Sequence, residues 1–179
     1  MTEPDQSIKA PARAVISLGS NLPDRLGHLS KAVRTLRAAP GINVVSVSGV
    51  YESQPVGEGL TGDFLNACVV CDVGISPHEL LALCRKTEEQ AGRDRDSEKR
   101  TGVRDRKLDL DIIFYGDLEC GDAELTLPHA RWDEREFVVL PLLDVRHDLT
   151  AHQRRLLDGS AQNLNLRSGS CRRVTEVLN

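Results

Sequence analysis

The order of hydrophobic patterns along the chain restricts its fold more than any other feature of the sequence. Four short segments are rich in apolar and β-branched residues, as strands are, and they span residues 13–18, 42–51, 63–73 and 107–115. The type of segment that connects these predicted strands therefore decides the fold class.

Two helical patterns lie between the predicted strands. The first is a single apolar stripe at helical spacing, formed by Leu26, Leu29, Val33 and Leu36. The second begins at Ser76 with a capping box, has Pro77 at its first position and runs to about Gly92. The resulting order β-α-β-β-α-β matches the split βαβ motif. We therefore expect an α+β, ferredoxin-like fold, an antiparallel sheet with helices packed on it.

The segments outside this core give weaker signals. Residues 52–62 are predicted to form a loop because they hold a proline and several glycines. Residues 93–106 are charged and without periodicity, so we predict a second loop, which is mobile when no ligand is bound. A small hairpin is expected within 116–124, and the type of the apolar segment 137–143 stays open.

A length of 179 residues suits one domain with short tails. We expect residues 1–12 to form a mobile N-terminal tail and residues 13–179 a single domain, in which residues 146–179 give weak signals. The first residues contain no apolar region of a signal peptide, and no apolar run approaches the roughly 20 residues of a membrane span. These features predict a cytoplasmic protein without a membrane partner.

Charge and aromatic content bear on the partners of the chain. The formal net charge is −4 and aromatic residues make up 3% of the sequence. Both values disfavour nucleic acid, because binding to phosphates needs basic surface and binding to single strands needs stacking rings. They give no information on protein partners.

The chain has five cysteines, and Cys68 and Cys71 form a CxxC pattern. A zinc site would need a second pair of ligands, and residues three apart on a strand point to opposite faces. The odd number and irregular spacing favour reduced thiols, and we expect Cys68 and Cys71 to be buried structural cysteines, with a metal or redox role as the alternative.

The strongest chemical signal is Lys107-Leu108-Asp109-Leu110-Asp111-Ile112. Because residues two apart share a face of a strand, the three apolar residues face the core while Asp109 and Asp111 project together on the other side. Two carboxylates placed in this way suit a hard cation such as Mg²⁺. The alternative is a solvated polar face, although aspartate is depleted in strands.

A basic segment precedes this strand. Residues 93–107 contain seven basic and four acidic side chains, and arginine forks suit phosphate oxygens. The interleaved acids leave a solvated charged loop as the alternative. His129 lies between Pro128 and Arg131, where it either contacts a ligand or is an ordinary surface histidine. The sequence contains neither a P-loop nor a GxGxxG motif.

Seven collinear segments resemble the 6-hydroxymethyl-7,8-dihydropterin pyrophosphokinase (HPPK) family. They are ISLGSN at 16–21, YESQPVG at 51–57, DFLNACV at 63–69, the E-x-x-x-G-R of 88–93, RKLDLDI at 106–112, LTLPHAR at 125–131 and REFVVLPL at 135–142. The resemblance covers roughly residues 13–145. It implies a ferredoxin-like enzyme that transfers the terminal pyrophosphate of ATP to the hydroxymethyl group of the pterin and releases AMP.

The resemblance also implies roles for individual residues. Asp109 and Asp111 resemble the ligands of two Mg²⁺ ions, and with Arg93 and Arg106 they form the expected catalytic set. The expected ATP contacts are Arg93, Arg95, Arg100, Arg106, Ile112, Thr126, His129 and Arg135. The expected pterin contacts are Ser53, Gln54, Val56, Phe64, Asn66 and Phe137. Ordinary core packing is the alternative for Phe64 and Phe137.

Three positions depart from the family pattern. Residues 100–109 are two residues longer than the usual R-W-G-P-R-T-L-D, so the roles of Arg100 and Arg104 are ambiguous. Thr101 stands where the loop tryptophan is usual, and Ala130 where an aromatic residue or proline is common. One wall of the closed pterin site is therefore expected to be missing.

The sequence is also compatible with two other functions. One is another metal-dependent nucleotidyl-transfer enzyme that uses the same acid pair and needs no pterin. The other is a non-catalytic ferredoxin-like binding module, in which replacing Asp109 would change nothing. The pyrophosphokinase hypothesis predicts instead that Asp109→Ala or Asp111→Ala abolishes turnover without unfolding the chain.

Overall fold

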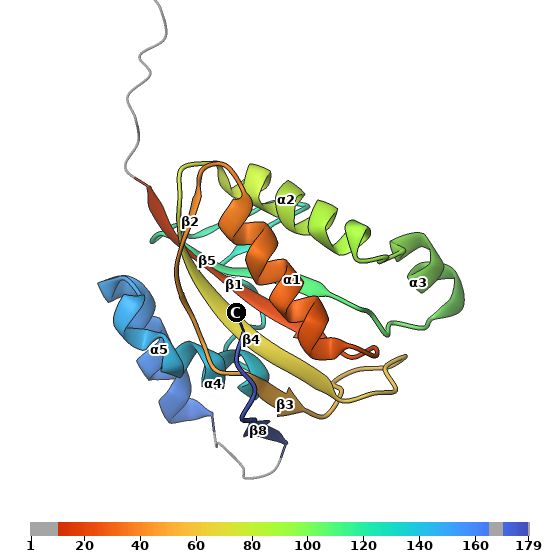
Figure 1. Cartoon of the computed structure of the whole chain (residues 1–179). Helices are drawn as coiled ribbons and strands as arrows, with labels where there is room; N and C mark the ends of the chain where they lie inside the picture. Colours follow the sequence, from red (N-terminus) through yellow and green to blue (C-terminus); the bar gives the residue numbers. More distant parts are fainter. Residues whose placement is uncertain (1–10, 165–169, 179) are drawn as a thin grey trace, which may run out of the picture.

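The protein, seen in a computed structural model that describes residues 11–164 and 170–178, is built around a central antiparallel sheet. Strand β1 (Ala12–Ser20) pairs with β5 (Asp109–Tyr115) on one side and with β4 (Phe64–Val73) on the other. Figure 1 shows β1 and β4 running side by side through the middle of the molecule. These three strands confirm three of the four predicted strands.

Further strands extend the sheet beyond β4. Both β2 (Ile42–Val47) and β3 (Tyr51–Ser53) pair with β4, although one strand was predicted over 42–51. The interruption lies at Ser48, whose N–H donates to Cys68 O (2.9 Å) and whose Oγ accepts from Cys68 N–H (2.8 Å). Strand β8 (Cys171–Arg173) pairs with β3, in a region whose sequence pattern is weak.

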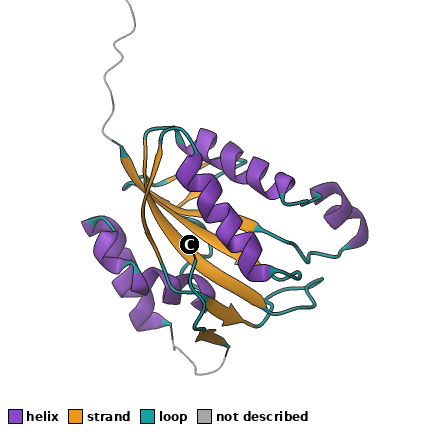
Figure 2. Ribbon diagram, viewed as in Figure 1, coloured by secondary structure: helices purple, strands orange, loops and turns teal. Residues whose placement is uncertain are grey.

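Helices α1 (Arg25–Ala38) and α2 (Pro77–Gln90) cover one face of the sheet, as Figure 2 shows in purple. Leu29, Val33 and Leu36 of the predicted apolar stripe of α1 are buried and Leu26 is half-buried, and α2 begins with the predicted capping box between Ser76 and Glu79. Leu108, Leu110 and Ile112 of the predicted alternating segment pack in the same core.

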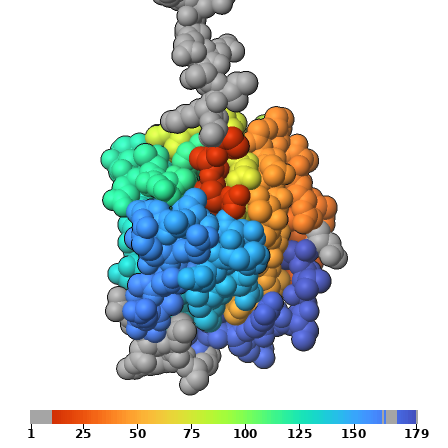
Figure 3. Space-filling model, turned by 90° about the vertical axis from the view of Figure 1, so that its left-hand side faces the viewer, coloured from red at the N-terminus to blue at the C-terminus, as the bar shows by residue number. Residues whose placement is uncertain are grey.

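The opposite face is covered by α4 (Glu136–Asp144) and α5 (Ala151–Asn163), with a short 3₁₀ turn at Arg146–Asp148 between them. The apolar segment whose type the sequence left open is therefore a helix, and a second layer of helices joins the two that were predicted. Phe114 and Trp132 meet edge to face in this second core, with ring centroids 4.9 Å apart. Figure 3 shows α4 and α5, in blue, below the start of β1.

The predicted loop over 93–106 contains a helix, α3 (Arg95–Thr101), so the prediction of a segment without regular structure is wrong there. Asp94 caps its start by accepting from Asp96 N–H (3.1 Å) and Ser97 N–H (2.9 Å). Gly102 ends it in the left-handed conformation at φ +74°. Short strands β6 (Cys120–Gly121) and β7 (Thr126–Leu127) form a hairpin, whose second strand lies beyond the predicted limits of 116–124.

The limits of the predicted tail also change. Ala12 belongs to β1 and pairs with Val73, whereas residues 1–10 lie outside the described residues. Within the described parts of the chain, every helix is too short or too polar to cross a membrane.

The CxxC cysteines lie on opposite faces of β4, with Cys68 in one core and Cys71 in the other. All five cysteines of the chain are free thiols, and burial raises the pKa of the Cys71 thiol to about 12. These positions agree with structural cysteines rather than a metal or redox pair.

The packing of α5 predicts its contribution to stability. Leu157 is fully buried against the sheet, so Leu157→Ala is expected to lower the free energy of unfolding by about 2–5 kcal/mol. Urea unfolding followed by the fluorescence of Trp132, the single tryptophan, measures this. The control Leu118→Ala, at a position 42% exposed, is expected to change stability by no more than about 0.5 kcal/mol. Equal effects of both variants would show that α5 does not share the core.

Candidate active site

The register of three strands places small and polar residues on one patch of the sheet. Gly19 pairs with Asp109 on β5 and with Asn66 on β4, and Ser17 pairs with Asp111. This patch lies on the face covered by α4 and α5, beyond the apolar residues that those helices bury. The uncovered end of this face is therefore a pocket with a polar floor.

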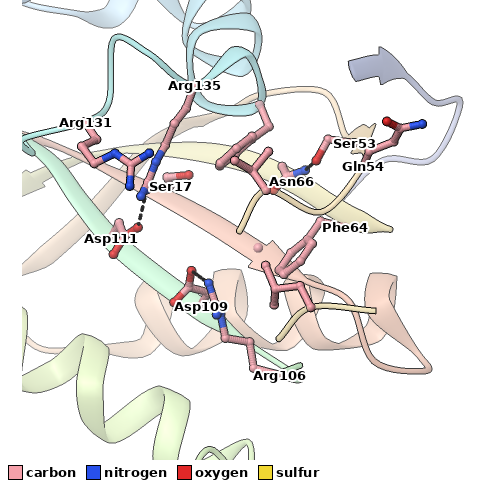
Figure 4. Close-up of a pocket in the computed structure, with 14 residues that line it drawn as sticks. Ser17, Ser53, Gln54, Phe64, Asn66, Arg106, Asp109, Asp111, Arg131 and Arg135 are labelled. Atoms are coloured by element: carbon pink, nitrogen blue, oxygen red, sulfur yellow. Dashed lines mark hydrogen bonds and ion pairs between the residues drawn. The ribbon is translucent and has the colours of Figure 1, made fainter. Parts of the chain in front are cut away.

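Residues from five parts of the chain line the pocket, and Figure 4 shows them around the ends of β1, β4 and β5. They are Ser17, Gly19, Ser53, Gln54, Val56, Leu60, Phe64, Asn66, Arg106, Asp109, Asp111, Arg131, Arg135 and Phe137. One end of the pocket carries acidic and basic side chains, and the other end carries amide and aromatic side chains. The two ends favour different parts of a ligand.

Asp109 is shared between two arginines. Arg93 Nη1 lies 2.6 Å from its Oδ1, and Arg106 Nη2 lies 2.7 Å from its Oδ2. Burial opposes ionisation of Asp109, but Arg106 and Arg93 outweigh this effect and hold its pKa below the usual value. Asp109 is therefore a carboxylate at neutral pH.

A buried glutamate holds Arg93 from behind. Glu88, at the end of α2, lies 2.7 Å from Arg93 Nη1, forms an ion pair with Arg95 and accepts a hydrogen bond from Leu110 N–H at 2.8 Å. Burial raises the pKa of Glu88, although Arg93 and the bond from Leu110 act against this. The glutamate thus ties α2 to β5 at the position of the acid pair.

Asp111 is less strongly paired than Asp109. Its Oδ2 lies 3.4 Å from Arg135 Nη1 and 3.9 Å from His129 Nε2. Burial and the neighbouring charge of Asp109 raise the pKa of Asp111. His129 Nδ1 accepts from Arg131 N–H at 3.3 Å, and burial lowers the pKa of the imidazole, so the neutral ring carries its proton on Nε2.

The aromatic end of the pocket combines two rings with one amide. Arg106 lies over the Phe64 ring at 5.5 Å, and Arg135 lies over the Phe137 ring at 5.7 Å. Asn66 Nδ2 donates to Ser53 Oγ at 2.9 Å, and a Cβ built on Gly19 would lie 3.5 Å from Asn66 Oδ1. The amide oxygen therefore faces the floor of the pocket.

The structure brings most of the residues expected at the site together. Ten of them line the pocket, and Arg93 contacts Asp109 from behind. Arg95 pairs with Glu88 outside the pocket, Arg100 is exposed on α3, and Thr126 is exposed on β7. Ile112 points its side chain into the core on the opposite face, so that side chain is not part of the pocket.

Four lining residues were not assigned from the sequence: Ser17, Gly19, Leu60 and Arg131. Ser17 and Gly19 lie within ISLGSN, and their alternation with the buried Ile16 and Leu18 is the signal that could have found them. Leu60 carried no signal, because a loop does not reveal which of its side chains turn inward.

The described residues contain no group of three or more histidine, cysteine or acidic side chains able to hold a metal by themselves. Asp109 and Asp111 nevertheless present carboxylate oxygens on one face of one strand. This donor set fits Mg²⁺, which often takes one or two carboxylates and completes its shell with water and phosphate oxygens.

Comparison with known proteins identifies the class of the chain. A family model described as 7,8-dihydro-6-hydroxymethylpterin-pyrophosphokinase (HPPK) matches residues 15–147. The chain belongs to this family, and it is therefore an enzyme of the pyrophosphokinase class.

Relatives over most of the chain support this assignment. A 2-amino-4-hydroxy-6-hydroxymethyldihydropteridine pyrophosphokinase of Methylorubrum extorquens is 41% identical over 137 residues, which are 76% of this chain and 84% of that protein. The enzyme of the same name from Bacillus subtilis is 39% identical over 132 residues, 74% of this chain and 77% of that protein. The mitochondrial folate synthesis bifunctional protein of Pisum sativum is 38% identical over 80% of this chain, which spans 28% of the pea protein.

Solved structures share the fold. A crystal structure of an HPPK-DHPS in complex with substrates has a TM-score of 0.64 and 13% identity, and it covers 92% of this chain and 47% of that one. At this identity the likeness concerns the fold alone: helices packed on an antiparallel sheet.

The acid pair predicts a measurable coupling. Asp109→Asn removes the neighbouring negative charge, so it is expected to lower the pKa of Asp111. Carbon-detected NMR titration of the carboxyl groups measures this shift. Asp122→Asn, in the surface pair with His78, is the control and leaves Asp111 unchanged. A pKa of Asp111 that stays the same in Asp109→Asn would contradict the coupling.

Proposed function

We propose that the chain transfers pyrophosphate from ATP to the hydroxymethyl group of 6-hydroxymethyl-7,8-dihydropterin and releases AMP. The pterin alcohol oxygen attacks the β-phosphorus in line, the bond from that phosphorus to the oxygen shared with the α-phosphate breaks, and the alcohol proton leaves. The supporting observation is that one pocket carries an acid pair with arginines at one end and two phenylalanines with an amide at the other.

At the phosphate end, we assign Arg106 and Arg135 to the triphosphate, with Arg93 behind Asp109. Arg106 supports this role because its buried Nε–H has no hydrogen-bond partner among the described residues, which leaves a donor for a ligand. Further contacts with ATP remain proposals for Arg95, Arg100, Thr126 and His129. For Ile112 we propose a contact through its backbone. Such a site acts by positioning and charge neutralisation, as phosphoryl transfer requires.

Asp109 and Asp111 are proposed to hold two Mg²⁺ ions together with the triphosphate. When bound, Mg²⁺ neutralises phosphate charge and lowers the pKa of an attacking hydroxyl. The chain itself contributes two carboxylates on one rigid strand, one of them kept ionised by Arg106 and Arg93. No side-chain base is needed in this proposal.

At the aromatic end, we assign the pterin to the space lined by Phe64, Phe137 and Asn66, with Ser53, Gln54 and Val56 beside them. A flat heterocycle suits two rings, and the Asn66 amide can read its polar edge. Leu60 is an additional apolar wall of this space.

The same proposal extends to the setting of the enzyme. The strand order β5-β1-β4, with β2 next to β4, supports the ferredoxin-like class. We further propose that residues 13–179 act as one pyrophosphokinase domain in the cytoplasm, with small-molecule substrates and neither nucleic acid nor membrane as partner.

The reaction product tests the function directly. Purified protein with ATP, Mg²⁺ and the dihydropterin is expected to form AMP, and formation stops when pterin or Mg²⁺ is left out. Asp109→Ala and Asp111→Ala are each expected to lower kcat by at least about a hundredfold, the scale for losing one preorganised charged group. Circular dichroism checks that both variants remain folded, and Asp122→Ala is the control. Formation of ADP, or an unchanged kcat in either variant, would refute the proposal.

The pterin assignment has a separate test. Asn66→Ala removes a buried amide from the pocket, so the KM for the pterin is expected to rise about tenfold while the KM for ATP changes little. The control Asn43→Ala replaces an exposed asparagine on β2. If the KM for ATP rose and that for the pterin did not, the two ends of the pocket would have to be exchanged.

A further inference from the structure

Two segments that both contribute side chains to the pocket also touch each other outside it. Residues 54–62 supply Val56 and Leu60 to the aromatic end, and residues 102–106 supply Arg106 to the phosphate end. Arg104 N–H donates to Gly59 O at 2.7 Å, which joins the two segments through their backbones. Their contact therefore links the two ends of the pocket.

Asp105 is the centre of this contact. Its Oδ1 accepts from Thr61 N–H at 2.9 Å and from Asn21 Nδ2, and its Oδ2 accepts from Thr61 Oγ1. Asn21 follows the end of β1, so one carboxylate joins three parts of the chain. We call Asn21, Thr61 and Asp105 the Asp105 clasp.

The clasp also holds the backbone of Arg106. Arg106 N–H donates to Asn21 Oδ1 at 2.8 Å, and Asn21 N–H donates to Arg106 O at 3.2 Å. From this position the Arg106 side chain reaches Asp109 at 2.7 Å and lies over the Phe64 ring. The orientation of Arg106 thus depends on the adjacent residue, Asp105, through Asn21.

The close approach of the two segments requires glycine at one position. A Cβ built on Gly59, at φ +76°, would lie 2.0 Å from Gly102 O. Gly102 itself has φ +74°, and a Cβ there would meet nothing within 4 Å. Only the first glycine is needed for contact between the segments.

We propose that Asp105 is a positioning residue that holds the pterin-side loop against the segment bearing Arg106. The proposal rests on the proposed function. Asp105 lies in the stretch that is two residues longer than the family pattern, and the clasp gives that stretch a role in holding the pocket wall formed by Val56 and Leu60.

Kinetics of Asp105 variants test the clasp. Asp105→Ala removes every acceptor, and we expect the KM for the pterin to rise about tenfold, the scale of a lost hydrogen bond to a charged group. We expect kcat to fall by less than the KM rises, because Asp109 and Asp111 keep their places. Asp105→Asn retains Oδ1 as an acceptor and is expected to restore most of the affinity. Asp96→Ala, on exposed α3, is the matched control.

A second pair of variants separates the clasp from backbone strain. Gly59→Ala and Gly102→Ala carry similar strain, because their φ angles are nearly equal, but only the first introduces a clash. We expect Gly59→Ala to raise the KM for the pterin as Asp105→Ala does, and Gly102→Ala to have a smaller effect. Equal effects of the two glycine variants, or an unchanged KM in Asp105→Ala, would overturn the proposal.

Hydrogen exchange distinguishes failure of the clasp from failure of the proposed function. In the ligand-free protein, Asp105→Ala is expected to speed exchange of the Thr61 and Arg104 amides by about tenfold or more, whereas Asp96→Ala does not. Unchanged exchange overturns the clasp even if the enzyme is active. A wild-type protein that forms no AMP, with exchange still faster in Asp105→Ala, refutes the proposed function and leaves the clasp in place.

Discussion

Gly19 pairs with Asp109 on one neighbouring strand and with Asn66 on the other, and this register joins the two ends of the pocket. A Cβ on Gly19 would lie 3.5 Å from Asn66 Oδ1 and 3.7 Å from Asp109 Cβ, so a larger residue would fill the floor between them. Antiparallel pairing leaves no freedom to shift one strand alone, because a slip by one residue turns every side chain to the other face. The acid pair and the amide are therefore neighbours only through β1.

The charges around this floor are balanced before any substrate arrives. Asp109 has Arg93 and Arg106, Arg93 has Glu88 and Glu98, and Asp111 faces Arg135. Such pairing is what permits charged groups in a partly buried site, where a single unpaired charge would be costly. In the proposed reaction, a triphosphate competes with the two aspartates for the same guanidinium groups. Binding would then exchange one set of ion pairs for another rather than create charge contacts from nothing.

The sequence predicted the strands and helices in which buried residues recur at a regular spacing. It missed helices that are defined by their capping residues or that are apolar on nearly every side. Helix α3 has no apolar stripe and is defined by Asp94 and Gly102 at its ends. Helix α4 is apolar on nearly every side, so its residues show no period. In α5 the buried side chains include Gln153, whose Nε2 donates to Arg13 O and Gly116 O, and such a polar contact gives no hydrophobic signal.

The residues of the candidate site also fall into those that the sequence predicted and those that it did not. Residues with distinctive chemistry, such as Asp109, Asp111 and Arg106, were found from the sequence because their spacing on one strand or loop is informative. Ser17 and Gly19 were not, since their importance is that they are small and stand opposite those acids. The contact of Asp105 with Thr61 was also beyond reach, because it joins residues 44 positions apart in two segments without periodicity.

The pairing of β1 with β5 shifts between Val15 and Ile16, where Ile112 and Phe114 are opposite neighbours and Ile113 is an extra residue. This β-bulge lets both Ile113 and Phe114 pack under α4 and α5, while Asp109 and Asp111 keep strict alternation. The bulge therefore separates the side-chain alternation of the acidic half of β5 from that of its apolar half. A change in strand length beyond the bulge alters only the apolar half, so evolution can remodel that half while Asp109 and Asp111 still face the pocket.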